Sequence, residues 1–558
     1  MGRRRRTVWE RILLLAFAGT GGLAALHCAW PAPPSTASNC SVALLSGFGV
    51  DAVSIASATD EAALPPNPVF CRVQGSIVTR GGAGDGLAEF VLKLPAAWNH
   101  RYLFFGCGGN CGSVDSVSAN AADVAAALSL GYATVNTDAG HEQDPSTPDP
   151  TWILLAPGVP NEPAIADFYY RAVHQVTVAT KTLAQDYYSG KIEYAYFDGC
   201  STGGRQSLME GERYPEDYDG LIAGDPVMDL DTQRAATIKQ AKAFLPPAAY
   251  IPYPLIPAID AAVDANCDAL DGTVDGLIQN PARCSFDPHS LVPATLSQAQ
   301  ADGLERYLAE VVDSAGRPVA PGMIVGDYAT SGFEGQAEVA APAADPTGAQ
   351  PWGGIGRGPS AWLIGDAGIR YYVEYDPAYD VNNDWPEDGN LIATAAVRLL
   401  KRRQGAGDSD DPAKLQTYLQ QGRKLILYHG FSDAQVSPYR SLWFYRALAQ
   451  QEHGYASLQD HARLFMVPGM GHCQGGSGPN SFDTLTALDQ WVTDGVAPEA
   501  LRAVNATTGR TMPLCKFPEE AKYVGGPVDA AGSWVCPATD RRLLETGPDG
   551  ALAGAARE

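Results

Sequence analysis

A serine between glycines is the clearest chemical motif of this chain. The segment Gly-Cys-Ser-Thr-Gly at residues 199–203 fits the pattern G-x-S-x-G and follows a strand-like run at 193–197. Glycines on both sides of a serine permit a sharp turn from a strand into a helix, which lifts the serine hydroxyl into a cleft. Because glycine and serine are common, the motif alone is weak, and Ser201 needs partners before it can be called a nucleophile.

Those partners occur downstream in the expected order. A serine hydroxyl is a poor nucleophile until a base takes its proton. His472, in Gly-Met-Gly-His-Cys, is the candidate base, and Asp433, in His-Gly-Phe-Ser-Asp, is the candidate acid that orients it. The order Ser, Asp, His is the one used by α/β-hydrolases. His429 and His141 are rivals for the base, although His429 is too near Asp433 in sequence to come easily from a separate loop.

A glycine-rich loop at residues 106–112 follows an apolar run and is the expected source of oxyanion stabilisation. A tetrahedral oxyanion needs two preorganised N–H donors. Thr202, directly after the serine, supplies one, and we choose the backbone of Gly108 for the other, with Gly109 as a near equal. A phosphate-binding loop is the alternative, but it lacks the lysine and the helix start that such loops require.

The cysteines support the same pairing of loops. Cys200 precedes Ser201 and Cys473 follows His472. A serine and its base must lie about 3 Å apart, which brings these cysteines within reach of a disulfide. Of the eleven cysteines, Cys28 lies in the leader, and the remaining ten suit an oxidising compartment. The other expected pairs, close in sequence, are Cys40–Cys71, Cys107–Cys111, Cys267–Cys284 and Cys515–Cys536. Cys107 and Cys111 could instead be free or bridged elsewhere.

Residues 267–277 hold a second group of carboxylates. Asp268, Asp271 and Asp275 recur at three- and four-residue intervals around two glycines, which allow tight turns that aim oxygens inward. Hard oxygen ligands favour Ca²⁺, and Thr273 and Leu277 could add backbone carbonyls. The spacing is not that of an EF-hand, and a solvated acidic turn is the alternative. An ion here would be structural, because a serine triad needs no metal.

The N-terminus and the net charge limit location and partners. Residues 1–30 have the pattern of a secretory signal peptide, with arginines at 3–6 before an apolar stretch at 12–26. Retention as an anchor is the alternative, disfavoured by a short, glycine-containing stretch. A net charge of −24 argues against nucleic acid or an anionic membrane as partner. We expect a secreted or periplasmic protein without membrane contact after signal removal, and without an organic cofactor.

Strand-like and helix-like runs alternate before residue 226 and again after residue 422, which indicates a mostly parallel sheet. The intervening segment is rich in Ala, Pro, Asp and Gly. We predict an α/β-hydrolase core in two parts, residues 40–226 and 422–545, interrupted by a lid domain at 227–421 that carries the calcium site. A separate domain in tandem is less consistent, because Ser201 and Asp433 fall on opposite sides of the segment.

Together these residues resemble the tannase and feruloyl esterase family of secreted α/β-hydrolases. The segment at 199–206, Gly-Cys-Ser-Thr-Gly-Gly-Arg-Gln, matches the family's nucleophile motif almost letter for letter, and Gly-His-Cys at 471–473 matches its histidine motif. Asp433 stands in the family's His-Gly-x-x-Asp context. The resemblance covers most of the mature chain. It implies the bond between Cys200 and Cys473 and a calcium site in the lid at 268–277.

The resemblance also implies an activity. Family members hydrolyse esters of aromatic acids of galloyl, feruloyl or hydroxycinnamoyl type, so the partner would be a small aromatic ester, free or attached to a plant polymer. A terephthalate monoester is the alternative substrate, and a non-catalytic protein that binds aromatic ligands on the same fold is the alternative function. Lid side chains that could either clamp an aromatic acid or form lid core are Trp352, Trp362, Arg370, Tyr371, Tyr372 and Trp385.

Overall fold

A nine-stranded sheet forms the centre of the molecule, with the strand order β1-β2-β3-β5-β4-β8-β9-β14-β15. The computed structural model describes residues 39–62, 68–118, 121–143, 150–333, 346–353 and 357–537. The predicted signal peptide at 1–30 and the last residues of the predicted second core segment, 538–545, lie outside these described residues.

The sheet is antiparallel at its N-terminal side and parallel elsewhere. Neighbours from β1 to β3, and the pair β3 and β5, are antiparallel, whereas all pairs from β5 through β15 are parallel. The strands are β1 Val53–Glu61, β2 Phe70–Thr79, β3 Gly86–Pro95, β4 Arg101–Phe105, β5 Ala133–Thr137, β8 Tyr194–Cys200, β9 Gly220–Gly224, β14 Lys424–Gly430 and β15 Ala462–Val467. The carboxyl ends of the parallel strands therefore meet at one edge, where functional loops of such sheets lie.

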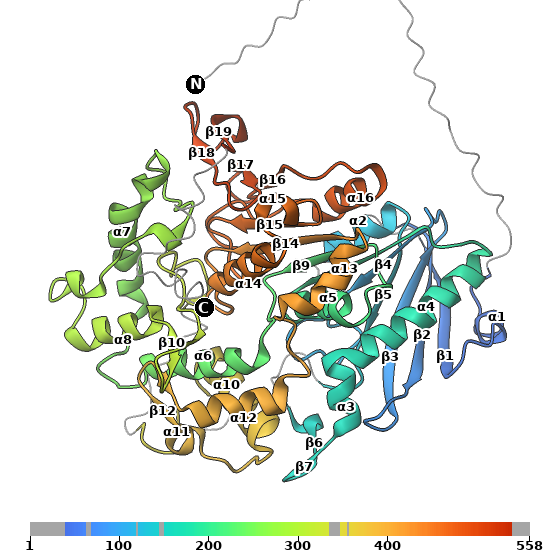
Figure 1. The fold of residues 1–558 in the computed structure, drawn as a ribbon, viewed down its shortest axis with the longest axis horizontal. Coiled ribbons are helices and arrows are strands. Elements are labelled where there is room, and N and C mark those ends of the chain that lie inside the picture. Colours follow the sequence, from blue (N-terminus) through green and yellow to red (C-terminus); the bar gives the residue numbers. More distant parts are fainter. Residues whose placement is uncertain are drawn as a thin grey trace, which may run out of the picture. The chain divides into compact units, whose positions relative to one another are not determined.

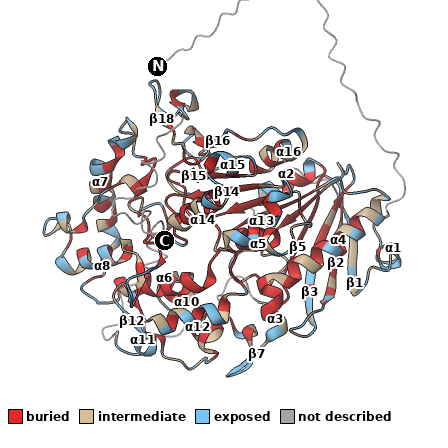
Figure 2. Cartoon of the chain, viewed as in Figure 1, coloured by how far each residue is buried: buried red, intermediate tan, exposed pale blue. Residues whose placement is uncertain are grey.

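Helices cover both faces of the parallel part of this sheet, so strands such as β5, β9 and β15 are buried on both sides, whereas β1 at the antiparallel edge is partly exposed along its length (Figures 1 and 2). Successive side chains of a strand point to opposite faces. In β4, Tyr102 and Phe104 enter one core cluster and Leu103 and Phe105 enter another. The first cluster includes side chains of α4 Ala172–Tyr188, α5 Thr202–Arg213, α13 Pro412–Gln420 and α14 Pro438–Gln451; the second includes side chains of α2 Ala121–Ser129 and α16 Thr484–Asp494.

The segment predicted as a lid forms a second layer of helices with a small sheet of its own. Its core includes Trp352, Trp362 and Trp385, packed with the apolar side of α6. Its elements are α6 Leu230–Ala243, α7 Ile256–Cys267, α8 Gln298–Leu308, β10 Val311–Asp313, β11 Pro318–Ala320, α10 Ser360–Ala367, α11 Val381–Asp384, β12 Glu387–Asp388, β13 Leu391–Ile392 and α12 Thr394–Gln404. Residues from Ser38 onward form one compact unit, so this layer is packed together with the sheet.

Helix α13 is an exception within the predicted lid segment. Leu415, Tyr418 and Leu419 pack into the same cluster as the sheet and α5. Their spacing places them on one face of a short helix, and the nearest apolar surface is that of the sheet. The inserted layer thus ends before α13 rather than at residue 421.

A C-terminal hairpin completes the described structure. It pairs β16 Ala500–Val504 with β17 Thr511–Cys515, beside the short pair β18 Lys522–Tyr523 and β19 Trp534–Val535. Smaller elements are α1 Val42–Gly47, β6 Leu154–Ala156, β7 Val159–Pro160, α3 Glu162–Ala166 and α15 Tyr455–Leu458. Among the described residues, no helix combines the length and the apolar character that a membrane crossing requires.

Candidate active site

Ser201 occupies a strained turn between β8 and α5. Its φ is 61° and its ψ is −122°, a backbone conformation that costs free energy for any residue other than glycine. The flanking glycines are required by space: a Cβ on Gly199 would lie 2.5 Å from the backbone of Gly203, and a Cβ on Gly203 would lie 2.5 Å from Ser118 Oγ. The Ser201 N–H donates to the carbonyl of Gly224 at 2.9 Å, which anchors the turn to β9.

His472 and Asp433 come together from two other loops. His472 Nδ1 lies 2.6 Å from Asp433 Oδ2, and the second oxygen of Asp433 accepts the backbone N–H groups of Gln435 at 2.8 Å and Val436 at 2.9 Å. Asp433 is fully buried, whereas the His472 side chain keeps 13% of its surface exposed. A buried carboxylate with hydrogen bonds to both oxygens can hold an imidazole in one orientation while the other side of the ring stays accessible.

The ionisation of this pair follows from its contacts. Burial by itself would raise the pKa of Asp433, but the attraction of His472 and hydrogen bonds from both His429 and His472 hold that pKa well below its usual range. Burial would lower the pKa of His472, but Asp433 outweighs it and raises the pKa above the ordinary value of 6.5. Asp433 is thus ionised at neutral pH and favours the imidazolium that forms when His472 accepts a proton.

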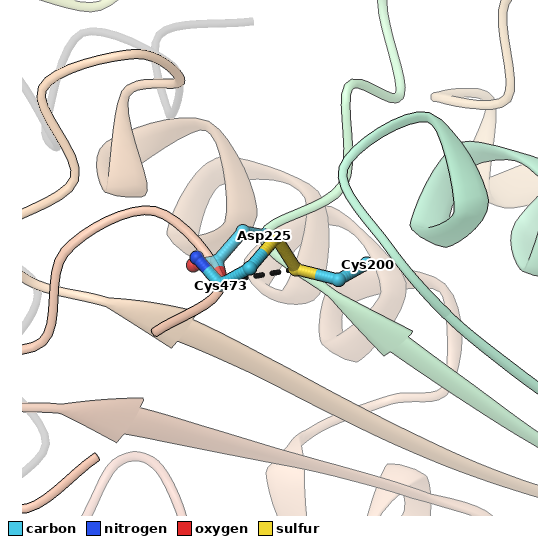
Figure 3. A group of neighbouring side chains, drawn as sticks. All are labelled: Cys200, Asp225 and Cys473. Atoms are coloured by element: carbon cyan, nitrogen blue, oxygen red, sulfur yellow. Dashed lines mark hydrogen bonds between the residues drawn. A yellow bond between two sulfur atoms is a disulfide. The ribbon is translucent and has the colours of Figure 1, made fainter. Parts of the chain in front are cut away.

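A disulfide joins the serine and histidine loops, as Figure 3 shows. Cys200 and Cys473 are bonded, with Cα atoms 6.0 Å apart, so the direct chain neighbours of Ser201 and His472 lie side by side. The other predicted pairs, Cys40–Cys71, Cys107–Cys111, Cys267–Cys284 and Cys515–Cys536, are bonded too. The structure therefore brings the loops of all three predicted triad residues to one place.

Neither rival histidine has the surroundings of a base. His429 is fully buried behind Asp433, where its Nδ1 lies 2.7 Å from Ser441 Oγ and its Nε2 lies 3.1 Å from the carbonyl of Val436. His141 is buried too, stacked on Trp152 with ring centroids 3.7 Å apart, and burial lowers its pKa to about 4. A ring without access to solvent cannot exchange protons readily with a bound ester, which leaves His472 as the candidate.

The oxyanion donors are placed unequally. Thr202 is the first residue of α5, so its N–H has no partner within the helix. The Gly108 N–H, which we chose as the second donor, is engaged by the carbonyl of Ser116 at 3.2 Å. Gly109, its near equal, lies closer to the nucleophile turn, because its carbonyl accepts the Thr202 hydroxyl at 2.6 Å. The glycine-rich loop therefore contacts the nucleophile turn through Gly109, and because the Gly108 N–H already has a partner, Gly109 is the better candidate for the second donor.

The acidic loop at 268–277 is folded around its own backbone. The two oxygens of Asp268 accept the N–H groups of Asp275 at 3.2 Å and Gly276 at 2.9 Å, and Asp271 accepts that of Thr273 at 3.1 Å. The Leu277 side chain is buried against Met512 of the C-terminal hairpin. The loop therefore connects the inserted layer to that hairpin, and the disulfide between Cys267 and Cys284 lies beside it.

Three carboxylate oxygens in this loop lack hydrogen-bond donors. Oδ2 of Asp271 and both side-chain oxygens of Asp275 are buried and unpartnered, and the nearest cation, Arg510 Nη2, lies 3.6 Å from Asp275. Burial and the charge of Asp275 raise the pKa of Asp271 to about 7. Among the described residues, the carboxylates of Asp268, Asp271 and Asp275 do not all come within 4.8 Å of one another, as the ligands of a bound ion would. The donor set suits a hard cation whose binding would draw the carboxylates closer together.

Most of the aromatic lid residues are structural, but one reaches the glycine-rich loop. Trp352, Trp362 and Trp385 lie in the lid core, and Arg370 is bound to Asp366 at 2.9 Å. Tyr372 instead packs with Trp152, Phe168 and the Cys107–Cys111 bridge, and its hydroxyl lies 3.4 Å from Asn110 Oδ1. Tyr371 of the predicted clamp packs against the same cluster, and the Tyr372 hydroxyl adds a hydrogen bond to the glycine-rich loop.

One residue of the site, Asp225, stands in no recognisable sequence motif. Asp225 follows β9 directly and is fully buried. Its carboxylate contacts the disulfide loop and the loop that carries Asp433. Its position at the carboxyl end of a central parallel strand was the available clue, since side chains at that edge converge.

Comparison with known proteins adds independent findings. Residues 71–537 match the protein family described as tannase and feruloyl esterase. A mono(2-hydroxyethyl) terephthalate hydrolase from Piscinibacter sakaiensis is 30% identical over 530 residues, which cover 84% of this chain and 85% of that protein. A probable feruloyl esterase from Arthroderma benhamiae is 27% identical over 513 residues, covering 87% and 90%.

The fold has the same relatives. The crystal structure of feruloyl esterase B from Aspergillus oryzae superposes with a TM-score of 0.73 at 23% identity, covering 88% of this chain and 97% of that one. This likeness shows that the chain has the α/β-hydrolase fold, with its largely parallel sheet and added helical layer.

Proposed function

This chain belongs to the tannase and feruloyl esterase family of carboxylic ester hydrolases, and on that premise we propose that it hydrolyses esters of aromatic carboxylic acids through a serine triad. The observation that carries the proposal is the junction of three loops. His472 is bonded to the buried Asp433 at 2.6 Å, and the disulfide beside it fixes the strained turn of Ser201.

In the proposed mechanism Ser201 Oγ attacks the ester carbonyl while His472 takes its proton. Asp433 keeps the imidazole in the required tautomer and stabilises its protonated form. The N–H of Thr202 and one from the glycine-rich loop, at Gly109, bind the oxyanion of the tetrahedral intermediate. His472 then protonates the leaving alcohol, and water releases the acid from the acyl-enzyme by the same steps in reverse.

The proposed acid is aromatic. The oxyanion loop borders a cluster that contains Trp152, Phe168 and Tyr372. The Trp152 ring packs edge to face with the other two at centroid distances of 5.3 and 6.1 Å, and the Phe168 and Tyr372 rings are tilted against each other at 6.3 Å. Aromatic surfaces of this kind favour a planar acyl group. Feruloyl, hydroxycinnamoyl and galloyl esters, free or attached to a plant polymer, are the proposed substrates. A terephthalate monoester is the second candidate, because the relative named for that substrate is 30% identical to this chain.

We also propose that the acidic loop binds a structural Ca²⁺. Asp268, Asp271 and Asp275 would hold the ion with side-chain oxygens, and Thr273 and Leu277 with backbone carbonyls. Bound Ca²⁺ supplies positive charge to carboxylates that lack donors of their own. The loop joins the inserted layer to the C-terminal hairpin, so the ion would stabilise the fold and take no part in ester hydrolysis.

The proposed location is outside the cytoplasm, secreted or periplasmic. Five disulfides are the supporting observation, since such bonds persist in oxidising compartments. The signal pattern at residues 1–30 agrees with it. Removal of that segment should be visible as a mature N-terminus close to residue 30 in the exported protein.

Hydrolysis of methyl gallate, methyl ferulate, methyl p-coumarate and a terephthalate monoester tests the function and ranks the substrates. Ser201→Ala should abolish turnover of the preferred ester. Ser207→Ala is the matched control, because it removes a buried, unpartnered hydroxyl from the same helix. A burst of alcohol release before the steady state would reveal the acyl-enzyme. Full activity of Ser201→Ala would refute the triad, and binding of the esters without turnover would favour the non-catalytic alternative.

A further inference from the structure

A second buried carboxylate, Asp225, lies under the proposed triad. Its Oδ2 accepts the backbone N–H of Cys473 at 2.9 Å and lies 3.3 Å from Cys200 Sγ (Figure 3). Its Oδ1 accepts the backbone N–H of Gly430 at 2.7 Å. One carboxylate therefore touches the nucleophile loop, the loop of Asp433 and the loop of His472.

The backbone around Asp225 shows how firmly this contact is set. Its φ is 35°, in the left-handed region that residues with a Cβ avoid, and its N–H donates to the carbonyl of Tyr428 at 2.9 Å. The next residue is Pro226. A strained residue with a fully buried charge persists only where its surroundings favour that arrangement strongly.

His429 completes a buried polar cluster of four side chains with Asp225, Asp433 and His472. Its Nε2 lies 3.2 Å from Asp433 Oδ2 and 3.5 Å from Asp225 Oδ1. Two carboxylates and two imidazoles thus alternate behind Ser201. The second carboxylate has no part in the mechanism above, although its attraction reaches His472.

We propose that Asp225 is a positioning residue of this active site, which holds the histidine loop against the loop of Asp433 and stabilises protonated His472 by its negative charge. The inference rests on the proposed function and extends it. A backbone N–H could be bound by a neutral amide as well, so the charge has a separate effect. When His472 takes the Ser201 proton, a nearby second anion favours the imidazolium.

Other ionisable groups near the cluster leave this effect in place. Asp433 and Asp225 are the two carboxylates whose charges raise the pKa of His472. Burial raises the pKa of Tyr428, beside Asp225, and of Tyr307, beside Asp433, well above 10, so both stay neutral. Asp327 of the inserted layer accepts the hydroxyls of Ser432 and Ser477, on the same two loops as Asp433 and His472.

Asp225→Asn tests the charge while it keeps an oxygen for the backbone donors. Nine histidines are present, and NMR titration with His472→Gln for assignment would give the pKa of His472 directly. We expect that pKa to fall by about one unit in Asp225→Asn, with kcat about tenfold lower and KM little changed. The acidic limb of the kcat profile should move to lower pH by the same amount. An unchanged His472 pKa would overturn the proposal.

Asp260→Asn is the matched control. Asp260 also accepts two backbone N–H groups, those of Tyr328 at 2.8 Å and Ala329 at 2.9 Å, and burial raises its pKa to about 6, as it does that of Asp225. It belongs to the inserted layer and is not among the groups that shift His472. Asp260→Asn should leave the pKa of His472 unchanged. An equal fall of that pKa in both variants would indicate a general loss of packing and would contradict a specific effect of Asp225.

The unaltered protein gives a second test if Asp225→Asn does not fold. A carboxylate oxygen of Asp225 lies within 4.8 Å of a ring nitrogen of His472. Burial raises the pKa of Asp225 to about 6, so the loss of its charge should appear in the His472 signals as a second inflection near that pH. A simple one-proton curve would then refute the proposal. The NMR result needs no turnover, so it remains decisive for Asp225 even if Ser201→Ala keeps its activity and the proposed function fails.

Discussion

Two groups of buried aspartates in this protein differ in the hydrogen-bond partners that their carboxylate oxygens receive. In the cluster around His472, both oxygens of Asp433 and both of Asp225 face backbone N–H groups, an imidazole or both. In the loop at 268–277, three carboxylate oxygens are buried without a donor. The residue type is the same, but the chain supplies a hydrogen-bond donor to every carboxylate oxygen of the first group and leaves three oxygens of the second group without one, with Arg510, 3.6 Å from Asp275, as the nearest positive charge.

This difference predicts different dependences on solution conditions. Leaving a buried charge unpaired costs several kcal/mol, so the acidic loop needs a cation or protons. The active-site cluster already contains imidazoles and amides. The pKa of Asp433 is therefore depressed, and Asp225, whose pKa burial raises to about 6, is still mostly ionised at neutral pH. The active site should therefore respond mainly to substitutions and pH, and the acidic loop mainly to calcium.

The largest expected effect is on the active-site side of this comparison. Asp433→Asn keeps the volume of the side chain but removes the charge that orients His472, so kcat should fall about 10⁴-fold. Steady-state kinetics on the preferred methyl ester measures it. Asp302→Asn, at an exposed carboxylate bound to His289, is the control and should leave kcat unchanged. A loss of less than tenfold in Asp433→Asn would contradict the assignment.

Next in size is the loss of the disulfide between the active-site loops. The double variant Cys200→Ala, Cys473→Ala opens a link across 273 residues, which the chain-entropy model values at about 5.6 kcal/mol of unfolding free energy. The pair Cys515 and Cys536, only 21 residues apart, is the control, with about 3 kcal/mol expected. Urea unfolding compares the two double variants. A smaller loss for the long link than for the short one would show that its role is not entropic.

Calcium removal should have an effect of intermediate size on the acidic loop. At a concentration one hundred times its Kd, an ion stabilises the folded state by about 2.7 kcal/mol, and EGTA should lower the Tm accordingly. In Asp271→Asn the effect of EGTA should vanish, while the apo form becomes slightly more stable because like charges are relieved. Scanning calorimetry with and without calcium measures both. If EGTA leaves the wild-type Tm unchanged, the loop is a solvated turn.

The smallest expected effect is the pH dependence of kcat/KM, which tests the active-site side of the comparison. His472 must be neutral to accept a proton, and Asp433 raises its pKa above 6.5. Activity should therefore fall about tenfold for each pH unit below that pKa. The depressed pKa of Asp433 gives stability that is present above its unfolded pKa and lost only as the pH falls through the folded value. Activity should thus disappear while circular dichroism still reports a folded protein.

Several features of the site could be predicted because residues adjacent in sequence must also lie close together in the fold. Cys200 beside Ser201 and Cys473 beside His472 made one disulfide a consequence of the proposed proton transfer, and that bond is present. The glycines around Ser201 predicted the strained turn, because a Cβ at either position would collide with backbone or side-chain atoms. In these cases the local pattern and the tertiary constraint coincide.

Other features could not be read from the chain. The Gly108 N–H is engaged by Ser116, eight residues downstream, a contact that depends on how the loop closes. Helix α13 falls within the segment predicted as a lid. It nevertheless packs on the sheet, because its apolar side fits the surface beside α5. Asp225 stands in no motif, and its proposed role depends on the pairing of β9 with β14, which brings it to the loop of Asp433.

The sequence by itself determined the nucleophile turn, the order of the candidate triad and the pairing of the cysteines beside it, because glycine, serine and cysteine act through local geometry and short-range chemistry. The tertiary structure decided which charges are satisfied. Whether a carboxylate finds a donor depends on residues hundreds of positions away: Asp225 meets Gly430 and Cys473, whereas Asp275 meets little besides Arg510. The electrostatic energy of a charge depends on its distances to other groups in space, and for residues far apart in sequence those distances are fixed only by the tertiary structure.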